Sequence, residues 1–165
     1  MICIFDLEGN GLKEDCSKLW CWVAKDIETG GTYEGSIKNG LDIQSWLNIV
    51  FNAGNIVVGH NIIDYDFTVI KRLYNRQPPR RFLDTYVMSR LLNPDRPPPK
   101  GFKPMQRHSL EAWGARLGIE KVGQEQWDEW DDNMLVRCKI DVEINHKALL
   151  TMLKEAEANS VEELV

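Results

Sequence analysis

The chain opens with MICIFDLEGNG, residues 1–11, and the rest of the predicted sheet is arranged around this segment. Its apolar run, with β-branched Ile2 and Ile4, predicts a strand buried on both faces, which is typical of the centre of a sheet. The glycine-rich turn that follows ends the strand. Because side chains two positions apart in a strand point to the same face, Asp6 and Glu8 converge at the strand's end. Two acids there favour a divalent metal site, and a pair of solvated acids beside a turn is the alternative.

Length and composition indicate a folded domain with its own core. The chain has 165 residues, of which 43% are apolar, and we expect residues 1–165 to form a single domain. No run approaches the roughly 18 apolar residues of a membrane span, and the first residues lack a signal-peptide pattern, so we expect a cytoplasmic protein without a membrane partner. Its four cysteines show no metal-ligand spacing and are expected to be reduced packing residues.

Charge is distributed unevenly along the chain. The net charge is −5, yet residues 71–107 hold ten Lys and Arg against two Asp, a balance of +8 that leaves −13 elsewhere. Such a segment can follow a phosphate backbone while acids in the rest of the chain hold metal. A solvated basic face without a partner is the alternative. The proline-rich part, about residues 93–107, is predicted to be an exposed basic loop.

Apolar periodicity and turn signals predict an α/β domain with a mixed sheet, in which the first strand is central. Further strands are expected at residues 19–24, 31–35, 55–59 and 81–83, and helices at 41–51, 62–73, 85–92, 110–117 and about 132–156. Asp84 and Ser109 are predicted N-caps of two of these helices. Trp127 and Trp130 lie in an acidic turn and are expected to be packing anchors.

Two later segments add acids to the candidate site. Asp66 follows His60 and Asn61 on the first turn of a predicted helix, where it would face the sheet. Asp141 lies in the middle of the last helix, with Arg137 one turn earlier on the same face. A mid-helix Asp can also be a plain surface residue. Four carboxylates from one strand and two helices are nevertheless what a pair of divalent ions requires.

These segments resemble the signatures of the DEDD superfamily of 3′→5′ exonucleases, and in particular the proofreading domain of short A-family bacteriophage DNA polymerases. The motifs are Asp6-Leu7-Glu8, His60-Asn61 with Tyr65-Asp66, and Asp141-Val142, together with accessory segments at 84–91 and 109–118. The resemblance covers nearly the whole chain. It implies a ribonuclease-H-like fold, with a central mixed five-stranded sheet flanked by helices.

The resemblance also implies residue roles. Asp6, Glu8, Asp66 and Asp141 would hold two Mg²⁺ or Mn²⁺ ions, which activate the attacking water and stabilise the leaving 3′ oxygen. Glu8 and the Gly9 backbone would position the terminal 3′-hydroxyl, Leu7 and Leu12 would contact the last base, and Asn61 and Tyr65 would shape the nucleotide site. His60 is either a structural histidine or a substrate contact.

One position departs from the family pattern. The family usually places a Tyr four residues before the last Asp, or a His five residues before it, whereas this chain has Arg137 and Val136 there. A guanidinium stays protonated and cannot act as a base. Loss of a positioned base typically lowers the rate about 10²–10⁴-fold. His108 is a candidate substitute, while His146 is expected to point away from Asp141.

The leading hypothesis is a metal-dependent 3′→5′ exonuclease that acts on single-stranded DNA ends and releases nucleoside 5′-monophosphates. With no polymerase sequence in this chain, we expect any proofreading to occur in trans, with a separate polymerase chain and in the host cytoplasm if the origin is a phage. The enzymatic alternative is an exoribonuclease on short RNA, because the same carboxylates serve both substrates. From another class, the alternative is a nucleic-acid-binding or polymerase-accessory module whose catalysis is weakened at Arg137.

Overall fold

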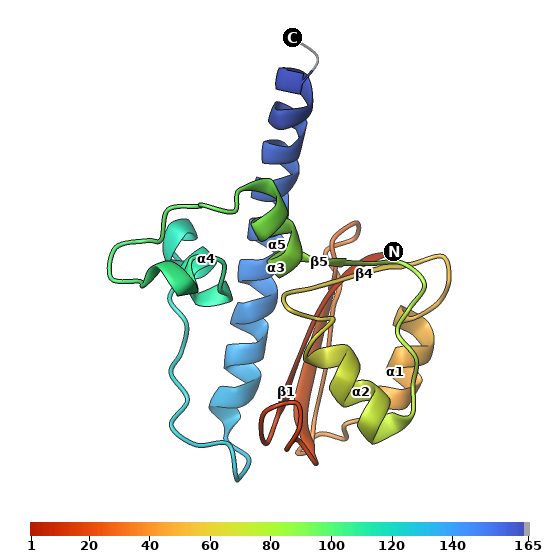
Figure 1. The fold of residues 1–165 in the computed structure, drawn as a ribbon. Helices are drawn as coiled ribbons and strands as arrows, with labels where there is room; N and C mark the ends of the chain where they lie inside the picture. Colours follow the sequence, from red (N-terminus) through yellow and green to blue (C-terminus); the bar gives the residue numbers. More distant parts are fainter. Residues whose placement is uncertain (164–165) are drawn as a thin grey trace.

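The computed structural model describes residues 1–163, and a five-stranded mixed sheet forms its centre (Figure 1). The strands are β1 (Ile2–Gly9), β2 (Leu19–Asp26), β3 (Thr32–Ser36), β4 (Ile56–Gly59) and β5 (Phe82–Asp84). Their order is β3-β2-β1-β4-β5, in which β2 is antiparallel to β1 and β3, and β4 is parallel to β1 and β5. This order confirms that the first strand is central and that the sheet is mixed.

Helices cover both faces of the sheet. They are α1 (Ile43–Val50), α2 (Asp66–Tyr74), α3 (Thr85–Leu92), α4 (Leu110–Leu117) and α5 (Asp132–Glu163), with a short 3₁₀ helix η1 (Pro104–Gln106). Figure 1 shows α1 and α2 on one side of the sheet, and α5 on the other with α3 and α4 beside it. Among the described helices, none combines the length and the apolar character that a membrane span requires.

Alternation along β1 divides the core into two layers. Phe5 and Leu7 face α1 and α2, and the Phe5 ring stacks on Trp46 with 4.8 Å between centroids. Ile4 faces α5, where it packs in the same cluster as Cys138. Asp6 and Glu8 lie on the same face of β1 as Ile4. The pleat of β1 therefore directs both acids toward α5.

Two helix boundaries differ from those that the sequence predicts. Helix α2 begins at Asp66 instead of residue 62, because residues 60–65 form a turn whose backbone is held by Asp84. Oδ1 of Asp84 accepts from Asn61 N at 2.9 Å, and Oδ2 accepts from Ile63 N at 3.2 Å. Helix α5 continues to Glu163 and extends past the sheet (Figure 1), since its last turns contain no Gly or Pro.

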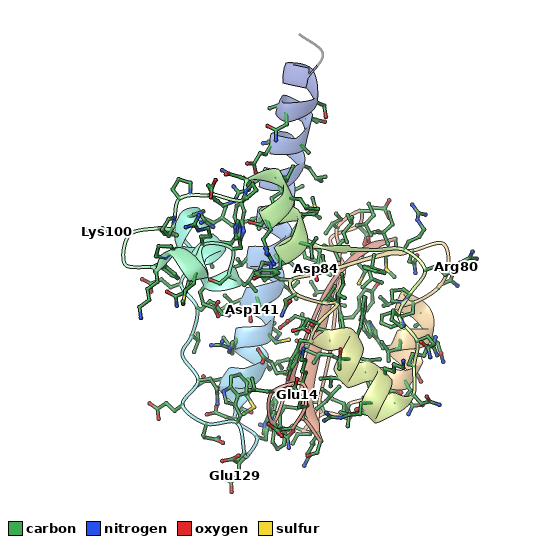
Figure 2. The ribbon with its side chains drawn as sticks, in the orientation of Figure 1. Glu14, Arg80, Asp84, Lys100, Glu129 and Asp141 are labelled. Carbon is green, nitrogen blue, oxygen red and sulfur yellow. The ribbon has the colours of Figure 1, made fainter. Side chains whose placement is uncertain are left out.

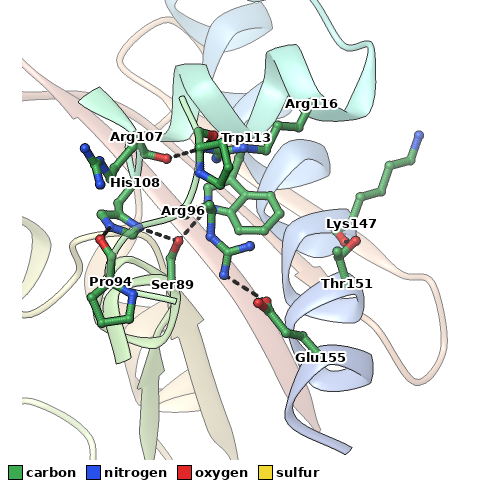
Figure 3. Close-up of polar contacts among 11 residues, drawn as sticks. Ser89, Pro94, Arg96, Arg107, His108, Trp113, Arg116, Lys147, Thr151 and Glu155 are labelled. Carbon is green, nitrogen blue, oxygen red and sulfur yellow. Dashed lines mark hydrogen bonds and ion pairs between the residues drawn. The ribbon is translucent and has the colours of Figure 1, made fainter. Parts of the chain in front are cut away.

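The proline-rich loop is anchored at one residue that was expected to be exposed. Lys100 lies at its outer edge (Figure 2), but Arg96 is only 8% exposed. The guanidinium carbon of Arg96 lies 4.7 Å from the Trp113 ring centroid, and Nη2 donates to Oε2 of Glu155 at 2.8 Å (Figure 3). The expectation of an exposed loop is therefore wrong for Arg96, which fastens the segment to α4 and α5 through stacking and an ion pair.

Candidate active site

Strand β1 and helix α5 bring three carboxylates together. Asp6 and Glu8 project from β1 toward α5, and Asp141 comes from the middle of α5 (Figure 2). One ligand oxygen from each of the three residues lies within 4.8 Å of the other two. This separation allows one divalent cation to be shared by all three, because carboxylate oxygens bind Mg²⁺ at about 2.0–2.1 Å.

Asp66, the fourth predicted acid, lies next to this group without belonging to it. It is the first residue of α2 and is 4% exposed. Burial, followed by the charge of Asp6, raises the pKa of Asp66. Oδ1 of Asp66 and Oδ2 of Asp6 are both buried and have no hydrogen-bond partner among the described residues. Buried carboxylate oxygens without donors are costly unless a cation binds them, so these residues fit divalent metal ions.

Burial raises the pKa values of all four acids, and repulsion within the group adds to this for Asp6, Glu8 and Asp66. Burial, followed by the charge of Asp141, raises the pKa of Asp6 to about 7. Burial, followed by the charges of Asp6 and Asp141, raises the pKa of Glu8 to about 10. Burial also raises the pKa of Asp66 and of Asp141 above their ordinary values. A divalent cation among the four acids would lower these pKa values, because it favours the charged carboxylates.

Two cations approach the carboxylate group. Lys121 Nζ lies 2.9 Å from Oδ1 of Asp141 and 2.9 Å from Oε1 of Glu111 on α4. Arg137 Nε lies 3.7 Å from Oε1 of Glu8, and its Nη2 lies 3.8 Å from Oε1 of Glu111. Arg137 was expected to pair with Asp141 or with substrate, but its carboxylate partners are Glu8 and Glu111, and Lys121 pairs with Asp141.

Sequence reasoning missed the roles of Lys121 and Glu111. Lys121 lies in residues 119–131, which have no regular secondary structure and no periodicity that could identify an inward-facing side chain. Glu111 lies in the first turn of a helix capped by Ser109, where an acid is explained by the helix dipole alone. Only the packing of α4 against α5 brings both residues to the candidate site.

A groove of about 540 Å³ adjoins the carboxylate group. Its lining residues are Glu8, Gly9, Asn10, Gly11, Leu12, Tyr65, Trp127 and Asp128. Four of the residues predicted to contact substrate or metal therefore line one groove, namely Glu8, Gly9, Leu12 and Tyr65. Trp127 was expected to be only a packing anchor, and its place in this lining was not predicted.

The turn after β1 is fixed by Gly9 and Tyr65. A Cβ at Gly9 would lie 2.5 Å from Sγ of Cys16 and 3.1 Å from the Tyr65 hydroxyl, so this position requires glycine. The Tyr65 hydroxyl donates to Gly11 O at 2.8 Å and joins the turn to the start of α2. Leu12, in the same turn, is 73% exposed and lies in the groove wall.

Leu7 does not accompany Leu12 in the groove. Its side chain is 3% exposed and packs in the core layer under α1 and α2, on the face of β1 opposite to Asp6 and Glu8. The predicted contact between Leu7 and the last base therefore needs correction, because strand alternation directs this side chain away from the site.

Asn61 and His60 belong to the turn before α2. Asn61 has φ of 57°, a left-handed conformation that Asn tolerates, and its N–H donates to Asp84. His60 Nδ1 lies 2.9 Å from Thr85 Oγ1, and desolvation lowers the pKa of His60 to about 4. His60 is therefore neutral near pH 7 and is held by α3, as expected for a structural histidine.

His108 and His146 lie outside the candidate site. The two ring nitrogens of His108 are engaged by Ser89 Oγ at 2.9 Å and by Pro94 O at 3.2 Å (Figure 3). His108 is therefore not available as the substitute base that the sequence suggested. Burial, followed by the charge of Lys25, lowers the pKa of His146, and the other charges that act on it, those of Glu143 and Lys147, also lie outside the carboxylate group.

A search against models of known protein families found no match. Among curated proteins, the chain is 30% identical over 159 residues to the DNA-directed DNA polymerase of Enterobacteria phage T3, and 29% identical over 161 residues to that of Escherichia phage T7. Each alignment covers 79% of this chain and 22% of the polymerase. The chain thus spans about a fifth of the length of these relatives.

Several solved structures share the fold. RNase D of Escherichia coli matches with a TM-score of 0.69 and 13% identity over 96% of this chain and 40% of its own. NrnC of Brucella melitensis with bound Mg²⁺ matches with a TM-score of 0.70 and 15% identity over 96% of this chain and 75% of its own. The predicted ribonuclease-H-like architecture is confirmed by these exonuclease neighbours. The sequence similarity to the phage polymerases and the fold shared with these exonucleases agree with the resemblance of the three motifs to the DEDD superfamily of 3′→5′ exonucleases.

Proposed function

We propose that residues 1–165 form one metal-dependent exonuclease domain that hydrolyses single-stranded DNA from its 3′ end and releases nucleoside 5′-monophosphates. The observation that carries this proposal is the group of Asp6, Glu8 and Asp141, with oxygens within 4.8 Å of one another, beside a groove of about 540 Å³. A nucleotide bound in the groove would place its phosphate against the acids.

Residues in and next to the groove have different proposed roles in binding the 3′ end. The Gly9 backbone and Glu8 receive the terminal 3′-hydroxyl, and the exposed Leu12 contacts the last base. Tyr65 holds the turn on which these residues lie, and Asn61 shapes the start of the neighbouring helix. Asp6, Glu8, Asp66 and Asp141 would hold two Mg²⁺ or Mn²⁺ ions, whose chemistry is to lower the pKa of a bound water and to stabilise the leaving oxygen.

Arg137 limits the rate in this proposal. It is anchored by its Nη1, which donates to Val122 O at 3.0 Å, and it lies 3.7 Å from Glu8, so it can contact a phosphate but cannot remove a proton from water. Without a positioned base, removal of a proton from the attacking water would be left to the ions that the four acids would hold, so we expect a rate of hydrolysis about 10²–10⁴-fold lower than with Tyr at position 137.

The DNA substrate is supported by the T3 and T7 relatives, which are DNA polymerases. For proofreading, the partner that we propose is a polymerase that presents its primer end in trans. The second candidate substrate is short RNA, and it is favoured by the fold shared with RNase D, described as an exoribonuclease, and with NrnC bound to pGG.

The test uses matched 5′-labelled DNA and RNA oligonucleotides with Mn²⁺, with the wild type, Asp6→Asn and Arg137→Tyr. Asp64→Asn is the control, because Asp64 lies two residues from Asp66 but is exposed and pairs with Lys13. The expected result is a 3′→5′ ladder on DNA with the wild type and with Asp64→Asn, no ladder with Asp6→Asn, and a faster ladder with Arg137→Tyr.

Other outcomes select the alternatives. A ladder on RNA that is faster than the ladder on DNA would identify an exoribonuclease. A ladder that appears only with Arg137→Tyr would identify a metal site that lacks a water-orienting group. Binding of the oligonucleotides in Ca²⁺, without hydrolysis by any variant in Mg²⁺ or Mn²⁺, would identify a binding module and overturn the enzymatic proposal.

A further inference from the structure

Trp127 occupies a position that the proposed function does not use. It is half-buried in the segment between α4 and α5, far in sequence from the turn after β1, yet both segments line the same groove. An indole in the wall of a groove that adjoins the carboxylate group is suited to hold a flat heteroaromatic ring. We infer that Trp127 is a binding platform on which one of the two 3′-terminal bases of the single strand stacks, an inference that rests on the proposed function.

A hydrogen bond and core packing hold Trp127 in place. The backbone carbonyl of Trp127 accepts from Nε1 of Trp20 on β2 at 2.9 Å, so the segment is fastened to the sheet at this residue. Part of the Trp127 side chain packs against the core layer between the sheet and α5. A base that stacks there meets a ring whose position is already fixed, and less conformational entropy is lost on binding.

Arg137 connects the platform to the acids. Its guanidinium carbon lies 5.5 Å from the Trp127 ring centroid, while its Nε lies 3.7 Å from Oε1 of Glu8. The same side chain thus contacts the aromatic wall and the carboxylate group. A nucleotide whose base lies on Trp127 would have its phosphate near Arg137 and Glu8, so stacking would also place the scissile bond.

The alternative role for Trp127 is packing alone, and Trp130 provides the comparison. Both residues lie in the same segment and pack against the same core layer. Trp130 donates from Nε1 to Asp132 Oδ1 at 3.2 Å, and it is absent from the groove lining. If packing were the whole explanation, the two tryptophans would respond alike to substitution when nucleic acid binding is measured.

Stacking predicts binding that does not select for base identity or for DNA over RNA. Every base has a π-face, so a stacked base gives affinity without sequence selection, and the contact ignores the 2′-hydroxyl. Removal of one stacking partner typically weakens single-strand binding about ten- to hundredfold. An abasic nucleotide at the stacked position should cause the same loss, because it removes the other half of the same contact.

The experiment measures binding by fluorescence anisotropy, using a 5′-fluorescein oligo(dT) of eight nucleotides in Ca²⁺ to prevent hydrolysis. Variants are Trp127→Leu, which keeps an apolar side chain for the core, Trp127→Phe, which keeps an aromatic face, and Trp130→Leu as the matched control. Each protein is tested with the intact oligonucleotide and with abasic versions at the 3′-terminal and penultimate positions. Thermal melts check that each variant folds.

We expect Trp127→Leu to bind about ten- to hundredfold more weakly, Trp127→Phe to bind nearly as well as the wild type, and Trp130→Leu to be unchanged. One abasic position should weaken the wild type by the same factor and leave Trp127→Leu unaffected. Equal abasic losses in the wild type and Trp127→Leu, or equal effects of the two Trp→Leu changes, would overturn the inference.

Hydrolysis in Mn²⁺ is scored separately, so stacking without a ladder would refute only the proposed function, and a ladder without the abasic signature would refute only the platform.

Discussion

The ammonium of Lys121 lies 2.9 Å from Oδ1 of Asp141, an acid that also belongs to the group able to share a divalent cation. An internal cation and a metal ion therefore compete for the same carboxylate. Glu111 is a second partner of Lys121 at 2.9 Å, so the lysine can keep one ion pair if Asp141 binds a metal ion. A metal ion at Asp141 would therefore have to displace the Lys121 ammonium or share the carboxylate with it.

Lys121→Met should raise the affinity for Mn²⁺ about tenfold or more. A unit charge about 4 Å away contributes about 4 kcal/mol at an effective dielectric of 20, so its removal strongly favours another cation at Asp141. Titration calorimetry with Mn²⁺ measures the change, and Lys121→Arg, which keeps the charge, is the control. Equal affinities in the wild type and Lys121→Met would mean that Lys121 does not oppose the metal.

Asp66→Asn should stabilise the metal-free protein and reduce its response to metal. Asp66 is buried beside Asp6 and has an oxygen without a partner, so a neutral amide relieves repulsion and desolvation. In the wild type, Mn²⁺ at a hundred times its Kd should add about 2.7 kcal/mol to the free energy of unfolding. Thermal melts in EDTA and in Mn²⁺ test both statements, with Asp64→Asn as the exposed control. A metal-free melting temperature that falls in Asp66→Asn would contradict the prediction.

The metal-free protein should lose stability as the pH rises from 7 to 9. The pKa of Glu8 is about 10 in the folded state against about 4.5 unfolded, and that of Asp6 is about 7 against about 3.8. The folded state binds more protons than the unfolded state in this window, so unfolding releases protons and the free energy of unfolding falls as the pH rises. His60, whose pKa is lowered to about 4 against 6.5 unfolded, is neutral in the folded state here and mostly neutral when unfolded, so its small contribution has the opposite sign and ends near pH 7.5.

Melts in EDTA across this pH range measure the slope. Glu8→Gln should flatten it, because the amide does not titrate. A wild-type melting temperature that stays constant or rises from pH 7 to pH 9 would show that these carboxylates are already charged in the folded protein.

The basic loop should contain two kinds of residue with separable effects. Neutralising Lys100 and Lys103, both exposed, should reduce the salt dependence of single-strand binding by about 0.7 per lost phosphate contact. Arg96→Met should leave that slope unchanged and destabilise the protein by about 1–2 kcal/mol, because Arg96 stacks on Trp113 and pairs with Glu155. Binding isotherms at several salt concentrations and urea melts distinguish the two. An altered salt slope in Arg96→Met would show that Arg96 contacts nucleic acid.

Local sequence signals determined most of the secondary structure and the identity of the acids. The apolar run with Asp6 and Glu8 at its end predicts a central strand with two carboxylates on one face, because alternation is a property of the strand itself. The caps at Asp84 and Ser109 fix the starts of α3 and α4 through hydrogen bonds to nearby backbone groups, and both are present in the structure. Such local rules need no knowledge of distant contacts.

Tertiary packing decided what surrounds the acids. Lys121 and Trp127 lie in a segment without regular structure, so no periodicity could show that one would reach Asp141 and the other the groove. Arg96 lies in a proline-rich loop that composition alone describes as exposed, yet a ring on α4 and a carboxylate on α5 bury it. The turn at residues 60–65 replaces a predicted helical turn because Asp84, more than 20 residues away in sequence, accepts its backbone hydrogens. The strand, the caps and the acids thus follow from local sequence, whereas the cations and the aromatic ring beside the acids depend on long-range contacts among α4, α5, the segment that joins these helices, and the sheet.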